Sequence, residues 1–479
     1  VAFVGMSGET SFTVRPGAYR VLVSRGPEWS IWPQDGVESH GYWFEIAEGE
    51  HPVFNAEIAH VVDSSGAMSG DFHLHQLNSP DSNTRMHERV LSALGEGLDI
   101  AVTTDHDYIT DLTPYIVALE AESEIASIIG EELTTATYGH YNSFPLSHVP
   151  DSINGGAFDW AGEADLNLPP QEIFAWFHEQ PGEQVVQVNH PVSGFIGYLE
   201  ADPLRGVSFV DPVVHRLPET EADPLTGDTG LWTDDFTAIE VLNGYGTGNM
   251  WAIMRWWFSM FGRGFSPTGT AVSDSHSTFN SPAGSPRTVV FLESDRDTPE
   301  SFIQAEFVES VNDGRAIGTT GPFFRFTAHN GEKTAEMGDV IAAEGAPIVF
   351  EVQLDLPEWM GVDTLEVYTN IEDVDTGGAA IYEPITPSFS LPVIWSEEDL
   401  QLASEGDERH YHWVKTVSFE IAAAVDSWVV VMARGLGESV SSMYPVLHSD
   451  VAPLAFSNPI FIDGDGGGYD NPPLLHLLH

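Results

Sequence analysis

The stretch GDFHLHQLNSPD, Gly70 to Asp81, places His73 and His75 two residues apart and has an acid near either end. Residues i and i+2 of a β-strand project to the same side, so both imidazoles would face one way if the segment is a strand. The pair is either a chance feature of a strand or the first half of a metal site. Its other ligands would then lie elsewhere in the chain.

Further candidate ligands follow apolar, strand-like runs between residues 68 and 322. The runs LDIAVTTDH, IASIIGEE, EQVVQVNH and GTAVSDSH alternate with helical patterns such as TRMHERVLSALGEG, which predicts βα units. In a parallel α/β barrel the carboxyl ends of the strands meet at one face, where the active site lies. We therefore expect the ligands at these ends to converge. Those that follow the first pair are Asp105 and His106, then Glu131, His190, Asp274 and His276.

Composition restricts the chemistry of such a centre. The chain has no cysteine, so a transition metal must be held by His and carboxylate groups, and a mixed set of this kind favours a multinuclear hydrolytic site. The 73 acidic and 17 basic residues, a net charge of -56, argue against nucleic acid and anionic membranes as partners. No run approaches the roughly 20 apolar residues of a membrane span. The acidic excess is typical of a solvated surface suited to salty surroundings.

The segments outside residues 68–322 have a different texture. Short β-like runs predict an N-terminal β-domain over residues 1–67 and a C-terminal β-sandwich-like domain over 323–460, followed by a tail over 461–479. In that tail, Asp463, Asp465 and Asp470 offer oxygens for a calcium ion, although a turn is the favoured interpretation. The chain starts at Val1, as a processed form or fragment would, and flanking β-domains are common in secreted assemblies. We therefore expect an extracytoplasmic location.

Several motifs occur in a fixed order. DFHLHxxxSPD, TTDHD, GEE followed by GHYNSFPL, VNHP and SDSH resemble the PHP (polymerase and histidinol phosphatase) metallohydrolases, and are most similar to the CehA/McbA-like branch. The resemblance covers about Gly70 to Pro322. It implies an α/β fold, a distorted (β/α)7 TIM-like barrel, that holds two or three divalent ions such as Zn, Mn or Fe.

The resemblance also implies a ligand set. One ion would be held by His73, His75, Glu131 and Asp274, and Glu131 would bridge to a second ion held by His140 and His190. A third ion would take the remaining ligands, which are Asp81, His106 and His276. Asp81 decides between two ions and three, because SPD replaces the commoner SDG pattern. His148 is the alternative to His140, while Asp105 and Asp107 are expected to orient imidazoles or bind loop backbone.

The expected reaction is hydrolysis by a metal-activated hydroxide, because close cations lower the pKa of a bound water. GxSxG and P-loop motifs are absent, which weakens serine-hydrolase and nucleotide-hydrolase interpretations. A phosphoesterase acting on a small ester is favoured. A carbamate, carboxyl ester or amide hydrolase is the first alternative, and a non-catalytic metal-binding extracellular or structural protein is the second. Candidate substrate contacts are Asn189, Asn243, Tyr245 and Arg287, the last because guanidinium pairs with phosphate oxygens.

Overall fold

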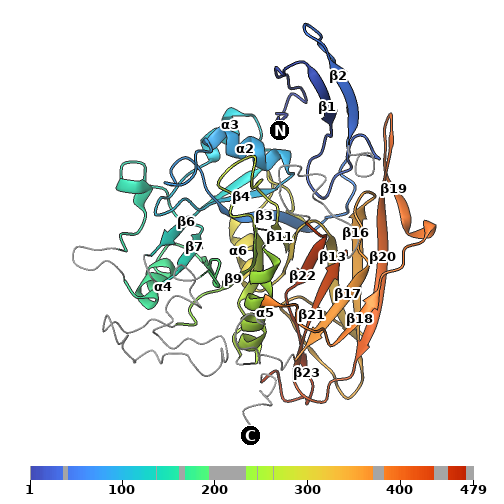
Figure 1. The fold of residues 1–479 in the computed structure, drawn as a ribbon. Helices are drawn as coiled ribbons and strands as arrows, with labels where there is room; N and C mark the ends of the chain where they lie inside the picture. Colours follow the sequence, from blue (N-terminus) through green and yellow to red (C-terminus); the bar gives the residue numbers. More distant parts are fainter. Residues whose placement is uncertain are drawn as a thin grey trace.

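The computed structural model describes residues 2–35, 41–135, 138–160, 168–193, 233–244, 246–262, 264–370, 382–435 and 451–470. Within them the chain is a mixed α/β protein with many strands and few helices (Figure 1). The helices are α2 (Met86–Gly95), α3 (Thr113–Ala118), α4 (Pro170–His178), α5 (Thr247–Phe261) and α6 (Gln304–Asn312), with short 3-10 turns η1 (Ile153–Gly156) and η5 (Glu397–Asp399). None of these helices is long and apolar enough to cross a membrane.

Two sheets carry the predicted strand ends. The first is five-stranded, in the order β10 (Thr268–Val272), β9 (Ala238–Asn243), β8 (Val185–Val188), β7 (His140–Phe144) and β6 (Glu131–Thr134). Strands β8, β9 and β10 pair in parallel, whereas β7 is antiparallel to both of its neighbours. Strand β7 therefore departs from the parallel arrangement expected of βα units, because the five residues between Thr134 and His140 are too few for a crossover helix.

The second sheet crosses the predicted domain boundary at residue 322. Its parallel part is β3 (Ala67–Leu74), β4 (Ile100–Thr103) and β5 (Ala126–Ile129), and β11 (Arg287–Phe291) runs antiparallel to β3. Beyond β11 the order continues through β12 (Ala316–Thr319), β22 (Leu454–Ser457), β21 (Ser427–Arg434), β23 (Ile460–Asp463) and β15 (Val340–Ala342). β17 (Thr364–Thr369) pairs with β21 and with β18 (Phe389–Pro392). A single sheet thus joins the middle segment to the C-terminal one.

Two isolated parallel bridges connect these sheets. Leu74 pairs with Ser275 and His106 pairs with Glu132. Each bridge therefore lies at or beside a predicted ligand. The strands of both sheets consequently meet around the candidate ligands, while closure into a (β/α)7 barrel stays a prediction.

A third sheet faces the C-terminal part of the second. Its order is β14 (Lys333–Glu336), β13 (Phe323–Asn330), β16 (Ile348–Pro357), β20 (Arg409–Ile421) and β19 (Leu400–Glu405). Alternate residues such as Phe326 and Phe350 are buried against Val429 and Val431 of β21, as strand periodicity requires. In Figure 1 these orange and red strands lie beside the middle segment. The N-terminal segment contributes the two-stranded sheet β1 (Gly17–Val21) and β2 (Tyr42–Ile46).

Helix α5 shows how closely the middle and C-terminal segments pack. Its residues are buried on every side from Met250 to Phe261, and most of them are apolar, among them Trp257 and Phe258. The Trp257 ring lies 6.0 Å from that of Phe456, and the Phe258 ring lies 4.7 Å from that of Trp428. The tryptophan-rich helix therefore belongs to a core shared with the C-terminal strands, and the domain limits at 67, 322 and 460 stay predictions.

Candidate metal centre

The histidine pair of the opening stretch lies at the end of a strand that is buried on both faces. His73 and His75 are both fully buried, and their Nε2 atoms lie 3.4 and 3.1 Å from Oδ1 of Asp274. Asp274 has a φ of 51°, a left-handed conformation that is uncommon for a residue other than glycine and that clusters at functional sites. The first two ligands from β3 and the acid after β10 thus form one group.

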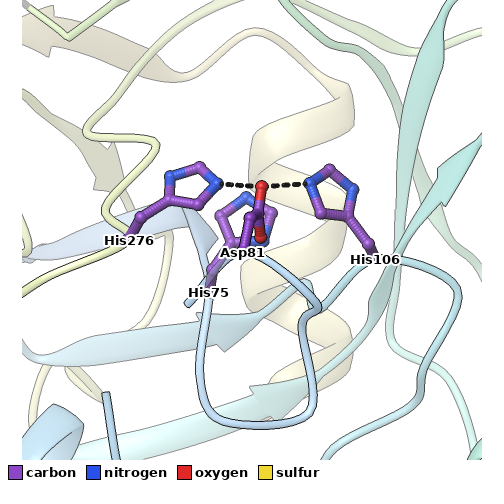
Figure 2. A group of neighbouring side chains, drawn as sticks. All are labelled: His75, Asp81, His106 and His276. Carbon is purple, nitrogen blue, oxygen red and sulfur yellow. Dashed lines mark hydrogen bonds and ion pairs between the residues drawn. The ribbon is translucent and has the colours of Figure 1, made fainter. Parts of the chain in front are cut away.

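A second group is built around Asp81 (Figure 2). Its Oδ2 lies 3.1 Å from Nε2 of His106 and 3.0 Å from Nε2 of His276, and the His75 ring lies behind it. The hydroxyl of Ser82 donates to the backbone oxygen of His276 at 2.9 Å, which ties the Asp81 loop to the turn after β10. SPD therefore brings its aspartate into the centre despite its departure from the SDG pattern.

The carboxylate of Glu132 connects the two groups. Its Oε1 lies 3.2 to 3.3 Å from ring nitrogens of His73, His140 and His190. Its Oε2 lies 2.7 Å from Nδ1 of His106 and 3.5 Å from Nε2 of His75. The two oxygens of one buried side chain thus face different imidazoles, which is the arrangement that a bridging carboxylate requires.

Glu131, predicted as the bridging ligand, does not lie in this centre. It is fully buried, but both of its oxygens lack a hydrogen-bond partner among the described residues, and no predicted ligand contacts them. Successive side chains of a strand point to opposite faces, so only one of two adjacent acids in β6 can face the histidines. The bridge between His106 and Glu132 places Glu132 on the inner face, and the assignment of Glu131 is wrong.

The other eight predicted ligands are brought together. His140 at the start of β7 and His190 after β8 have ring centroids 4.9 Å apart and share Glu132. His148 belongs to none of the groups that could hold an ion in the described part of the chain, whereas His140 does. That these eight residues bind metal stays a prediction. The residues that converge are His73, His75, Asp81, His106, His140, His190, Asp274 and His276.

The donor set fits divalent cations. Two ligand atoms bound tetrahedrally to one zinc ion at about 2.1 Å lie about 3.4 Å apart, which is close to the spacings given above. Nε2 of His73 is buried without a hydrogen-bond partner in the described structure, as is Oε2 of Glu132. Buried polar atoms are normally satisfied, and a shared cation would satisfy these two atoms, which lie close to other ring nitrogens and carboxylate oxygens but form no well-directed hydrogen bond.

Neighbouring groups set which nitrogen of each imidazole faces the centre. Nδ1 of His73 contacts Oε1 of Glu240 at 2.6 Å, and Nδ1 of His75 contacts the hydroxyl of Ser79 at 3.0 Å. Nδ1 of His276 donates to the backbone oxygen of Asp274 at 2.9 Å. Because Nδ1 is engaged in all three, Nε2 is left to bind metal.

Glu240 is a candidate positioning residue that the sequence motifs did not indicate. It is fully buried on β9 and accepts from Nδ1 of His73, from the backbone N–H of His190 at 2.5 Å and from Nδ2 of Asn243 at 2.8 Å. It therefore orients two predicted ligands through one carboxylate. The available signal was a single acid inside the apolar run FTAIEVLNG, since an unpaired buried charge is costly.

The protonation of the centre reflects its density of carboxylates. Burial alone would lower the pKa of His106, but Glu132 and Asp81 outweigh it and raise that pKa to about 9. Burial lowers the pKa of His75 to about 4, which keeps this imidazole neutral. Burial opposes ionisation of Glu132, yet the charges of His73 and His106 hold its pKa well below the usual range. Protons thus occupy positions that metal ions would take.

Of the four predicted substrate contacts, the structure places two beside the centre and one away from it, and does not describe the fourth. The side-chain nitrogen of Asn189 donates to Oε1 of Glu132 at 3.0 Å, and that of Asn243 donates to Oδ2 of Asp274 at 3.2 Å, so both lie behind ligands. Tyr245 lies outside the described residues. Arg287 is buried, donates to the backbone oxygens of Gly284 and Glu96, and lies 3.6 Å from Glu28. The structure therefore contradicts the expected contact between Arg287 and a substrate phosphate.

The acids around His106 bind backbone, as expected. Asp105 accepts from the backbone N–H of Gln76 at 2.5 Å, and Asp107 accepts from that of Thr134 at 2.9 Å. Asp105 thus fixes the loop that follows His75, and Asp107 fixes the end of strand β6, which carries Glu132. They are positioning groups and belong to none of the described clusters that could hold an ion.

A separate acidic cluster lies at the C-terminal end of the described chain. Carboxylate oxygens of Asp463 and Asp465 lie close to one of Asp426, which precedes β21. Asp470 contributes its backbone N–H, which donates to Asp426 at 2.6 Å, and its side chain is outside the group. Asp426 thus takes the place expected for Asp470, and calcium binding here stays a prediction.

Comparisons with known proteins give only distant neighbours. No protein-family model and no curated protein matches the chain. One similar solved structure is a two-domain protein from Bacteroides vulgatus that contains a predicted PHP-like metal-dependent phosphoesterase, at 14% identity, 84% and 97% coverage of the two chains and a TM-score of 0.35. Another is Endonuclease Q in complex with a 27-mer duplex bearing an abasic lesion, at 12% identity, 48% and 54% coverage and a TM-score of 0.29. Both TM-scores lie below 0.5, so these neighbours carry no argument about the function of this chain. The evidence for its function is the arrangement of side chains in the centre.

Proposed function

We propose that this protein is a PHP-type metal-dependent hydrolase of the CehA/McbA-like branch that cleaves a small phosphoester. The observation that carries the proposal is the convergence of three ligand groups on Glu132, whose two oxygens face different imidazoles. Divalent ions held by such a set would lower the pKa of water so that a hydroxide nucleophile is available near neutral pH. A centre that only binds metal has no need for so many convergent ligands.

The exposure of the ligands indicates where a substrate enters. The side chains of His73 and Glu132 are 0% exposed, whereas those of His276 and Asp81 are 33% and 48% exposed. The first two form the floor of the centre and the last two form its open edge. At that edge Asp81 and His276 would together bind the third ion, and in its absence they can hold a proton between Oδ2 and Nε2.

A second candidate is hydrolysis of a carbamate or another neutral ester. In the described part of the chain, no Lys or Arg side chain pairs with Asp81, Glu132 or Asp274. Arg287 lies elsewhere, and among the described residues no guanidinium pairs with Asp81 or His276 at the open edge. This favours a substrate of low charge, and the net charge of -56 makes a nucleic acid an unsuitable substrate.

The test is hydrolysis by protein loaded with zinc, manganese or iron. The substrates are p-nitrophenyl phosphate, bis-p-nitrophenyl phosphate, a naphthyl carbamate and a DNA duplex with an abasic site. We expect turnover of a phosphoester that a chelator abolishes and added metal restores. Turnover of the carbamate alone would favour the second candidate, and turnover of DNA alone would contradict the choice of a small substrate. No turnover of any of them by the metal-loaded protein would favour a non-catalytic metal-binding protein.

A further inference from the structure

Arg89 of helix α2 lies beneath the centre and contacts two of its ligand-bearing segments. It is fully buried, and its Nη2 donates to the backbone oxygens of His75 and Ser275, both at 2.7 Å. Its Nη1 donates to the hydroxyl of Ser275, also at 2.7 Å. Within the described structure, the hydrogen bonds of its side chain therefore go to the end of β3 and to the turn after β10.

This placement is costly unless the guanidinium has a specific task. A buried charge requires compensation, and no acid forms a hydrogen bond or ion pair with Arg89 in the described structure. Its charge is balanced at longer range by Asp71 and Asp105. These acids in turn accept from the backbone N–H of Ser273 at 3.1 Å and of Gln76 at 2.5 Å. A layer of three buried charges is thus attached to the backbone next to the ligands.

The two segments that Arg89 joins must keep a fixed spacing. Leu74 and Ser275 form an isolated bridge, which is the contact between β3 and the turn after β10 at this point. The rings of His75 and His276, which come from the two segments, stack with centroids 4.0 Å apart. The planar, rigid fork of a guanidinium fixes two acceptors more closely than a flexible ammonium does.

We propose that Arg89 is a positioning residue that holds His75 and the Asp274–His276 turn in register, so that the ligand group of His75, Asp81, His106 and His276 can share an ion. This inference rests on the proposed function, because it presumes that the centre binds metal. It predicts a larger effect on ions bound by His75 and the Asp274–His276 turn than on an ion held by Glu132 with His140. The contacts of Glu132 with His140 and His190 do not involve Arg89.

The test compares Arg89→Met, Arg89→Lys and Arg287→Met in the full chain. Arg287 is a matched control because it is equally buried and donates to backbone oxygens, but to those of Gly284 and Glu96. Zinc and cobalt are the probes. Stoichiometry is measured by elemental analysis, affinity by competition with a chromogenic chelator, and geometry by the visible absorption of bound cobalt. Thermal unfolding of each metal-free variant reports any general loss of stability.

Loss of a residue that orients ligands typically weakens metal binding about 10- to 100-fold. We expect Arg89→Met to weaken one class of bound ion by that factor and to change its cobalt spectrum, and Arg89→Lys to recover part of the affinity. Arg287→Met should keep wild-type stoichiometry even if its unfolding temperature falls. Wild-type affinity and spectrum in Arg89→Met would overturn the inference, as would equal metal loss in Arg287→Met. If wild-type protein binds ions but hydrolyses no ester, only the proposed function fails; if it binds no ion, both fail.

Discussion

Replacing Glu132 by Gln tests the bridging carboxylate directly. The change keeps the size of the side chain but removes its charge, while its oxygens now face imidazoles of both ligand groups at 2.7 to 3.5 Å. Loss of a residue that merely orients ligands costs about 10- to 100-fold in metal affinity, so loss of a shared ligand should exceed that range. We expect metal affinity to fall by at least about 100-fold, or about 2.7 kcal/mol, and hydrolysis to fall with it.

The neighbouring acid provides the control for this experiment. Glu131→Gln alters a residue on the same strand that is equally buried, but whose oxygens contact no predicted ligand in the described structure. We expect its metal content to equal that of the wild-type protein. Both variants are measured by competition with a chelator and by elemental analysis after dialysis. Equal metal loss in both, or loss in Glu131→Gln alone, would refute the assignment of Glu132 to the centre.

Three further predictions concern protonation and packing. Because carboxylates raise the pKa of His106 to about 9 against the effect of burial, metal uptake at pH 7 should release protons and apparent affinity should rise with pH up to about 9; titration calorimetry in buffers of different ionisation enthalpy measures this, and uptake without proton release would contradict it. Burial raises the pKa of Glu131 to about 8, so the folded state keeps a proton that the unfolded state loses above about pH 4.3. As the pH rises from about 4.3 to 8, the free energy of unfolding of the wild-type protein should therefore fall relative to that of Glu131→Gln, by at most about 1.4 kcal/mol per pH unit. Urea unfolding at several pH values measures this difference, and a difference that does not change across that window would disprove the prediction. A chain that ends at Pro322 loses Trp428 and Phe456, which pack on α5, and burial of one large apolar side chain contributes about 1.5–3 kcal/mol, so this fragment should not unfold cooperatively when monitored by near-ultraviolet circular dichroism. A sharp transition would indicate that the middle segment is independent.

Much of the centre could be predicted because its ligands follow local rules. His73 and His75 share a face through strand periodicity alone, and SDSH places Asp274 and His276 after a buried strand in the same way. The mixed α/β character also follows from the alternation of apolar runs and amphipathic segments. These features need no knowledge of which strands become neighbours.

The errors arise where pairing between distant segments decides the outcome. The choice between Glu131 and Glu132 depends on the phase of β6, which follows a break at Gly130, where a Cβ atom would lie 2.6 Å from the backbone oxygen of Ser143. Arg287 starts a strand that runs antiparallel to β3, so its side chain reaches Glu96 rather than the ligands. The residues of a strand alone do not determine which of its side chains face the centre or whether it runs parallel to its neighbour, because both depend on pairing with other strands.

Two acids that lie beside predicted ligands, Glu240 and Asp426, were also hard to predict. Glu240 has no motif of its own and becomes recognisable only when Nδ1 of His73 lies 2.6 Å away. Asp426 joins Asp463 and Asp465 because β21 and β23 pair, which brings together segments far apart in the chain. Such roles depend on tertiary contacts, for which spacing along the sequence gives no signal.

The most direct test of the centre is anomalous diffraction from crystals of the metal-loaded protein, recorded on both sides of the absorption edge of the bound metal. We predict two or three peaks, with Glu132 between them and with His73, His75, His106 and Asp274 among the ligands. A peak at Asp81 would establish the third ion. Crystals that show no anomalous peak among these histidines, or a peak bound by Glu131 in place of Glu132, would contradict the proposed centre.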